Sequence, residues 1–146
     1  MDLPSDREAL QTALRKLKSG DRFESEIRAF LSDFSSEAVD DVITYLKGRR
    51  IIDDTRTIQN LVERYSGKRS IGTEKLRAEL LERGAPEEIV DTVMASRIAS
   101  ESSKMLEVLS AKFTPAVSRA KAARFLYSRG FPDEEIESVL DRFFQP

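Results

Sequence analysis

The stretch that decides the fold occurs twice, as LLERGAPEEI at residues 80–89 and as LYSRGFPDEEI at residues 126–136. The second copy carries one inserted acidic residue. In both copies a basic residue and a glycine are typical of a helix C-terminus, because glycine tolerates a positive φ. The proline and acidic residues that follow are typical of the start of another helix. Each copy therefore predicts one helix ending and the next beginning.

Between such junctions the apolar residues recur at spacings of three and four, as in Leu10, Leu14 and Leu17, which predicts amphipathic helices. No segment demands a strand, so we predict an all-α fold. Four prolines are expected to precede helices, those of the quoted junctions at the first helical position: Pro4, Pro86, Pro115 and Pro132. All six glycines are expected to end helices: Gly20, Gly48, Gly67, Gly72, Gly84 and Gly130.

The predicted helices fall into three tandem repeats of three helices each. A period in the high forties relates Leu31, Leu80 and Leu126, which lie in the second helix of each repeat. Stacked helical units of this size form an elongated, curved array with a long surface for another macromolecule. The predicted repeats span residues 5–50, 53–98 and 100–145.

The composition argues against several classes of protein. The chain of 146 residues is 40% hydrophobic, enough for a folded core, and has neither cysteine nor histidine. Without cysteine the chain forms no disulfide. Without histidine it lacks the commonest general base and the commonest transition-metal ligand. We expect no enzyme, no cofactor and no metal, and we expect the protein in the cytoplasm. Acidic residues interrupt the apolar runs of residues 1–30, so we expect neither a signal peptide nor a membrane span.

Two blocks of residues have a spacing typical of one known family. The block in the second repeat joins an acidic pair to a glycine, two leucines and a basic-Gly end: Ile51-Ile52-Asp53-Asp54, Gly72, Leu76, Leu80 and Arg83-Gly84. The block in the third repeat joins a leucine, a basic-Gly-Phe turn and a helix: Leu126, Arg129-Gly130-Phe131, Ile136 and Leu140. Over residues 8–144 the chain resembles the RecX family, which regulates the bacterial recombinase RecA. Thr57 and Ile58 depart from the family pattern of an aromatic residue and an alanine.

The resemblance implies a negative regulator of recombination, DNA repair and the SOS response. Such a protein lies in the groove of a RecA filament on single-stranded DNA and blocks its extension. It thereby lowers the ATP turnover, strand exchange and co-protease activity of RecA. The resemblance implies no catalysis by the regulator itself. We expect a monomer that binds free DNA weakly if at all and does not bind membranes.

Two short motifs invite comparison with chemical sites. The adjacent Asp53 and Asp54 are interpreted as the start of the fourth helix, because aspartate is a preferred N-cap and neighbours on a helix do not face each other. Gly67-Lys68-Arg69-Ser70 lacks the earlier glycine of a phosphate-binding loop and follows a predicted helix instead of a strand. Nucleotide binding is therefore rejected.

Positive charge is concentrated in the middle of the chain. Residues 45–84 hold ten basic and six acidic residues, net +4, whereas residues 1–44 carry −4 and residues 85–146 carry −2. This charge is either a solvated face or a contact strip for DNA phosphates or acidic patches on the recombinase. Under the second interpretation the contacts come from this pool: Arg49, Arg50, Arg64, Lys68, Arg69, Lys75, Arg77 and Arg83.

Two other functions remain open. One is an architectural or helix-turn-helix-like DNA-binding protein that acts without a recombinase. The other is a scaffold that binds partner helices in apolar grooves. The pI near 5.4 argues against general DNA binding as the main role. Five phenylalanines lie on apolar faces and are expected in the core instead of stacking on bases: Phe30, Phe34, Phe113, Phe125 and Phe143.

Overall fold

The computed structural model describes residues 2–145, and within that range it contains nine α-helices, one short 3-10 helix and no strand. The first three helices are α1 (Arg7–Leu17), α2 (Glu24–Phe30) and α3 (Ser36–Gly48). The next are α4 (Asp54–Arg64), the 3-10 helix η1 (Gly67–Arg69), α5 (Thr73–Glu82) and α6 (Glu87–Ala99). The last are α7 (Glu101–Lys112), α8 (Arg119–Ser128) and α9 (Asp133–Phe144). In this part of the chain, no helix is long and apolar enough to cross a membrane.

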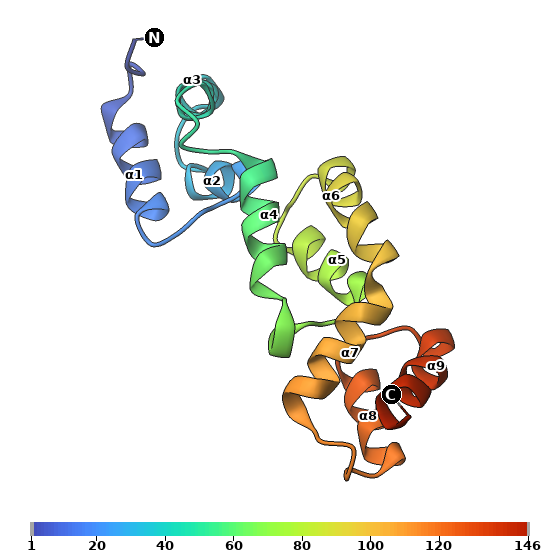
Figure 1. Cartoon of the computed structure of the whole chain (residues 1–146). Helices are drawn as coiled ribbons and strands as arrows, with labels where there is room; N and C mark the ends of the chain where they lie inside the picture. Colours follow the sequence, from blue (N-terminus) through green and yellow to red (C-terminus); the bar gives the residue numbers. More distant parts are fainter. Residues whose placement is uncertain (1, 146) are drawn as a thin grey trace.

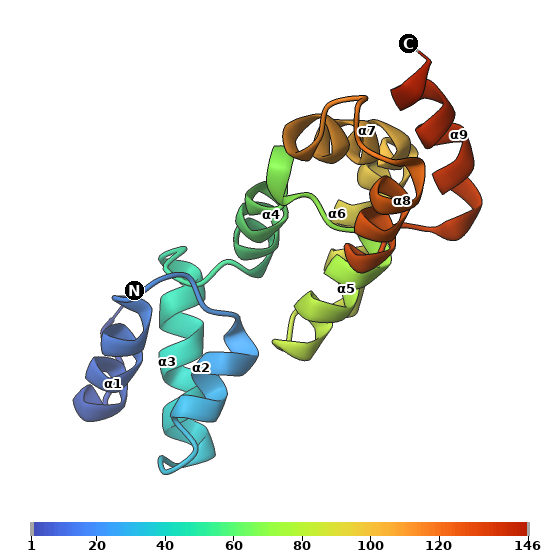
Figure 2. The same ribbon diagram turned by 90° about the horizontal axis from the view of Figure 1, so that it is seen from below.

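The helices lie in three successive groups, which we call trio 1 (α1–α3), trio 2 (α4–α6 with η1) and trio 3 (α7–α9). Trio 1 and trio 3 occupy opposite ends of an elongated molecule (Figures 1 and 2). The all-α fold is confirmed, and the grouping agrees with the predicted three-helix repeats. The repeat boundaries stay predictions, and α6 extends to Ala99, one residue past the second of them.

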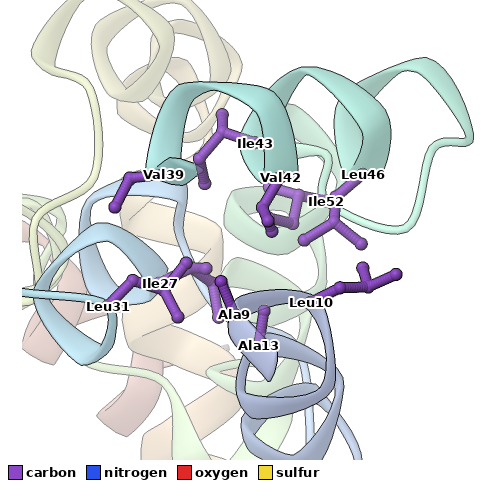
Figure 3. Packing of buried hydrophobic residues seen from close by; sticks show 10 residues of the cluster. All are labelled: Ala9, Leu10, Ala13, Ile27, Leu31, Val39, Val42, Ile43, Leu46 and Ile52. Carbon is purple, nitrogen blue, oxygen red and sulfur yellow. The ribbon is translucent and has the colours of Figure 1, made fainter. Parts of the chain in front are cut away.

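Each trio is built around a hydrophobic cluster of its own. In trio 1 the cluster joins Leu10 of α1, Ile27 of α2 and Leu46 of α3, all of them buried (Figure 3). Trio 2 buries Ile58, Leu76 and Met94, and trio 3 buries Met105, Leu126 and Leu140, listed in chain order. One buried residue belongs to a neighbour's cluster, because Phe23 precedes α2 but packs in the cluster of trio 2.

Side-chain caps explain where several of the helices begin. The side chains of Asp6, Ser35, Asp53 and Ser118 each accept a hydrogen bond from a backbone N–H in the first turn of the helix that follows. The interpretation of Asp53 as the start of a helix is therefore confirmed. Its neighbour Asp54 is the first residue of α4.

The prediction that every glycine ends a helix is only partly correct. Gly84 and Gly130 follow α5 and α8 with φ of 100° and 79°, as expected of helix ends. Gly72 instead precedes α5 as its N-cap, with φ of −59°. A Cβ on Gly72 would lie 1.9 Å from the Gly130 oxygen, so glycine is needed there for a close approach of two backbones.

Gly48 ends α3 as predicted, but the left-handed residue after that helix is Arg50, with φ of 57°. The predicted position of the junction prolines is wrong. Pro86 and Pro132 are N-cap residues instead of first helical residues, since α6 and α9 begin one residue later. An N-cap position suits proline equally well, because its missing N–H has no intrahelical partner there.

The five phenylalanines expected in the core pack against the clusters as predicted. Phe143 is buried, and Phe30, Phe34, Phe113 and Phe125 are partly buried against trio 1 or trio 3. Phe113 and Phe125 meet edge to face with ring centroids 5.4 Å apart. These rings are therefore engaged inside the protein.

Candidate functional site

The eight basic residues singled out in the sequence divide into two groups in the structure. Three of them make polar contacts within the protein, namely Lys75, Arg77 and Arg83. The other five are exposed and have no carboxylate at ion-pair distance among residues 2–145: Arg49, Arg50, Arg64, Lys68 and Arg69. The positive charges of these five residues are therefore accessible to an anionic partner.

Arg77 ties α5 to α6. Its Nε lies 2.7 Å from the Asp91 carboxylate, and its Nη2 lies 2.7 Å from the Glu87 carboxylate. The hydrogen bond to Asp91, with that to Glu87, raises the pKa of Arg77, and the same contact lowers the pKa of Asp91. Arg77 is thus committed to a contact inside trio 2.

Lys75 and Arg83 connect neighbouring trios. The Arg83 guanidinium lies 3.0 Å from the Glu26 carboxylate of α2 and 5.2 Å from the centre of the Phe23 ring. The Lys75 ammonium donates to the Ser128 carbonyl oxygen at the end of α8, at 3.2 Å. Both side chains therefore have a structural role that does not depend on a partner.

One cluster of exposed cations lies where α4 ends. Arg64 is the last residue of α4, and Lys68 and Arg69 lie in η1 just beyond it. The Arg129 guanidinium of trio 3 reaches this segment and donates to the carbonyl oxygens of Lys68 and Ser70, both at 3.2 Å. We call Arg64, Lys68 and Arg69 the α4-end cluster, and Arg129 holds its backbone in place.

A small hollow of about 220 Å³ adjoins the α4-end cluster, between the α1–α2 loop and α4. Three guanidinium-bearing residues line it, Arg22, Arg64 and Arg83, with Asp21 as its acidic residue. Sequence reasoning missed Arg22 because it lies in the acidic N-terminal third of the chain. Sequence reasoning also missed Arg129. The position of Arg129 in the repeated Arg-Gly motif matches that of Arg83 and could have revealed it.

A second cluster of exposed cations lies at the other end of α4, where α3 stops. It consists of Arg49 and Arg50, and the Arg49 guanidinium lies 5.1 Å from the centre of the Tyr45 ring. Since α4 is an eleven-residue helix, the two clusters are separated by roughly 16 Å of helix. Exposed positive charge is thus present at both ends of one helix.

The acidic pair before α4 is occupied by backbone contacts. Asp53 accepts from the Arg56 N–H at 3.1 Å, and Asp54 accepts from the Glu24 N–H at 2.9 Å. Burial is the main reason that the pKa of Asp54 is raised. Among the residues that the structure describes, no group of three or more metal-ligating side chains comes together.

Comparison with known proteins gives consistent relatives, although no family model matches the chain. A protein of Chlorobium phaeobacteroides named Regulatory protein RecX is 30% identical over 147 residues, which cover 96% of each chain. A protein of Thermus thermophilus with the same name is 34% identical over 126 residues, which cover 86% of this chain and 84% of the relative.

A solved structure supports the same fold. The crystal structure of RecX from Lactobacillus salivarius matches with a TM-score of 0.71 and 15% identity, over 93% of this chain and 94% of the other. The relatives are named as regulatory proteins, which identifies this chain as a regulator and not an enzyme. Because the sequence likeness extends over nearly the whole of both proteins, the chain belongs to the RecX family.

Proposed function

We propose that this protein restrains a RecA-type recombinase by binding the groove of its filament on single-stranded DNA. Binding there limits filament extension and lowers ATP turnover, strand exchange and co-protease activity, with consequences for DNA repair and the SOS response. The protein acts as a monomer in the cytoplasm. The observation that carries the proposal is the pair of exposed cation clusters at the two ends of α4, in the middle of an elongated array.

The charge distribution favours a local contact over general attraction to DNA. The whole chain carries a net charge of −2, so its overall field does not draw it to nucleic acid. Many other cations form ion pairs with acidic residues of the same chain, for example Arg28 with Glu24 and Asp40. The α4-end cluster and Arg49 with Arg50 are free to meet phosphates or carboxylates of a nucleoprotein filament.

The test compares two triple-alanine variants in an assay of the ATPase activity of RecA on single-stranded DNA. One variant replaces Arg64, Lys68 and Arg69, and the matched control replaces the exposed cations Arg7, Arg15 and Lys18 of trio 1, so both lose the same charge. We expect the first variant to inhibit at least about tenfold more weakly and the control to inhibit normally. Circular dichroism checks that the helix content is unchanged.

Undiminished inhibition by the α4-end variant would remove this cluster from the proposal. The salt dependence of binding separates the proposal from the second candidate, an architectural or helix-turn-helix-like DNA-binding protein. That candidate requires binding to bare DNA that weakens steeply as salt increases, because phosphate contacts release counterions. A regulator of the filament requires tight association only when RecA and nucleotide are both present.

A further inference from the structure

The two joints between trios share one design, which begins with a shared helix cap. The N-cap residues of the middle helices α2 and α5 are Phe23 and Gly72, and neither has a side-chain acceptor to cap its own helix. The first residue of the following trio supplies a carboxylate instead. Asp54 accepts from the Glu24 N–H and Glu101 accepts from the Thr73 N–H, each at 2.9 Å.

The second shared element is the Arg-Gly turn. Gly84, after α5, lies against Ser25 at the start of α2, and the Ser25 hydroxyl donates to the Gly84 carbonyl oxygen at 2.7 Å. Gly130, after α8, lies in the same way against Lys75 at the start of α5. The turns that end α5 and α8 therefore each pack on the first turn of the preceding middle helix.

The second joint, between trio 2 and trio 3, is sealed by buried groups. The Gly72 N–H donates to the Arg129 carbonyl oxygen at 2.8 Å, so the two backbones are bonded directly. The Glu101 side chain of α7 is only 7% exposed, and its carboxylate also accepts a hydrogen bond from the Thr73 hydroxyl of α5. In addition, η1 packs against α7, and Ser100 alone separates α6 from α7.

The first joint, between trio 1 and trio 2, is held by contacts that water reaches. Arg56 of α4 lies 3.7 Å from the Asp21 carboxylate, with each side chain 38% exposed, and the Arg83 guanidinium lies 3.0 Å from the Glu26 carboxylate. Among the described residues no backbone-to-backbone hydrogen bond crosses this joint. The connecting segment is also longer, at residues 49–53.

The same hollow occurs at both joints but differs in size. At the first joint it is lined by Ser25, Asp54 and Gly84, among others, and has a volume of about 720 Å³. At the second joint the corresponding hollow is lined by Glu74, Glu101 and Gly130, among others, and has a volume of about 260 Å³. One design is therefore open at the first joint and closed at the second.

We infer that trio 2 and trio 3 form one rigid body and that trio 1 swings relative to it at the first joint. Phe23 is the pivot, because its ring is fully buried in the cluster of trio 2 while its backbone belongs to trio 1. The exposed ion pairs oppose the motion only weakly, because water and salt screen them. The swing changes the curvature of the array and lets one chain follow surfaces of different curvature.

The test uses spin labels on the full-length chain, which contains no cysteine of its own. One pair of labels, at Ser36→Cys and Ser96→Cys, spans the first joint, and a second pair, at Ser96→Cys and Ser138→Cys, spans the second joint. All three serines are exposed. Pulsed electron paramagnetic resonance then gives the distribution of distances within each pair without any recombinase, so the result does not depend on the proposed function.

We expect the distribution across the first joint to be at least about twice as wide as that across the second. Arg83→Gln removes the ion pair to Glu26 and should widen only the first distribution. Arg15→Gln, in α1 and away from the joints, should widen neither. Equal widths at the two joints, whether both narrow or both broad, would overturn the inference.

Discussion

Replacing Glu101 with alanine should lower the free energy of unfolding by about 2–4 kcal/mol. The Glu101 side chain is 7% exposed and accepts hydrogen bonds from both the backbone N–H and the hydroxyl of Thr73. Alanine leaves both donors buried without a partner, at about 1–3 kcal/mol for each. The hydroxyl can rotate toward another acceptor but the N–H cannot, so the expected total lies below the sum of the two maxima.

Asp54→Ala is the matched comparison, because Asp54 has the same place in the first joint. It accepts only the Glu24 N–H, and it is only half-buried. Burial raises the pKa of Asp54, so its charged form is already disfavoured in the folded protein. We therefore expect a loss of about 0.5–1.5 kcal/mol, in the range of an ordinary helix cap.

Unfolding in urea, followed by circular dichroism, measures both variants without adding salt. Glu107→Ala serves as a surface control, since Glu107 is exposed and lies 3.9 Å from Lys104 on the same helix. It should change the unfolding free energy by less than about 0.5 kcal/mol. If Asp54→Ala destabilised the protein as much as Glu101→Ala, the claim that the second joint is sealed and the first is open would be refuted.

Two further predictions concern the close approach at the second joint and the ion pairs of Glu24 within trio 1. Gly72→Ala should lower the free energy of unfolding in urea by about 1–3 kcal/mol, because the added Cβ would overlap the Gly130 oxygen. Gly48→Ala at the end of α3 is the control. An equal loss in the two variants would contradict the close approach of the two backbones. Burial acts to raise the pKa of Glu24, but hydrogen bonds from Lys47 and Arg28 outweigh it and the pKa is lowered. The stability that this group contributes is thus present above its unfolded pKa and is lost as the pH falls through its folded pKa. Between about pH 5 and pH 3 the wild type should lose more stability than Glu24→Gln, and parallel losses would contradict this.

The fold was predictable because its signals are local. The spacing of apolar residues, the Arg-Gly ends and caps such as Asp53 all act within a few residues, so a linear pattern records them. The role of Gly72 was missed because it depends on Gly130, which is distant in the sequence and adjacent in space. A glycine that permits a close approach and a glycine that ends a helix look the same in a sequence.

The candidate site was less predictable for a related reason. Local charge density marked the middle of the chain correctly as basic, but it could not show which cations are already paired. Arg77 meets Glu87 and Asp91, which lie beyond the reach of pairing within one helix. Only the folded chain separates such residues from the α4-end cluster.

The repeated motif has a different meaning in the structure from the one it has in the sequence. Taken locally, the Arg-Gly of residues 83–84 and 129–130 only ends a helix. In the structure both turns also pack on the preceding trio, through Gly84 on Ser25 and Gly130 on Lys75. The end of α2 lacks the motif, with Ser32 and Asp33 near the corresponding place, and among the described residues no preceding trio contacts it. The motif therefore marks joints between trios, and its two copies correspond to the two joints on which the shape of the array depends.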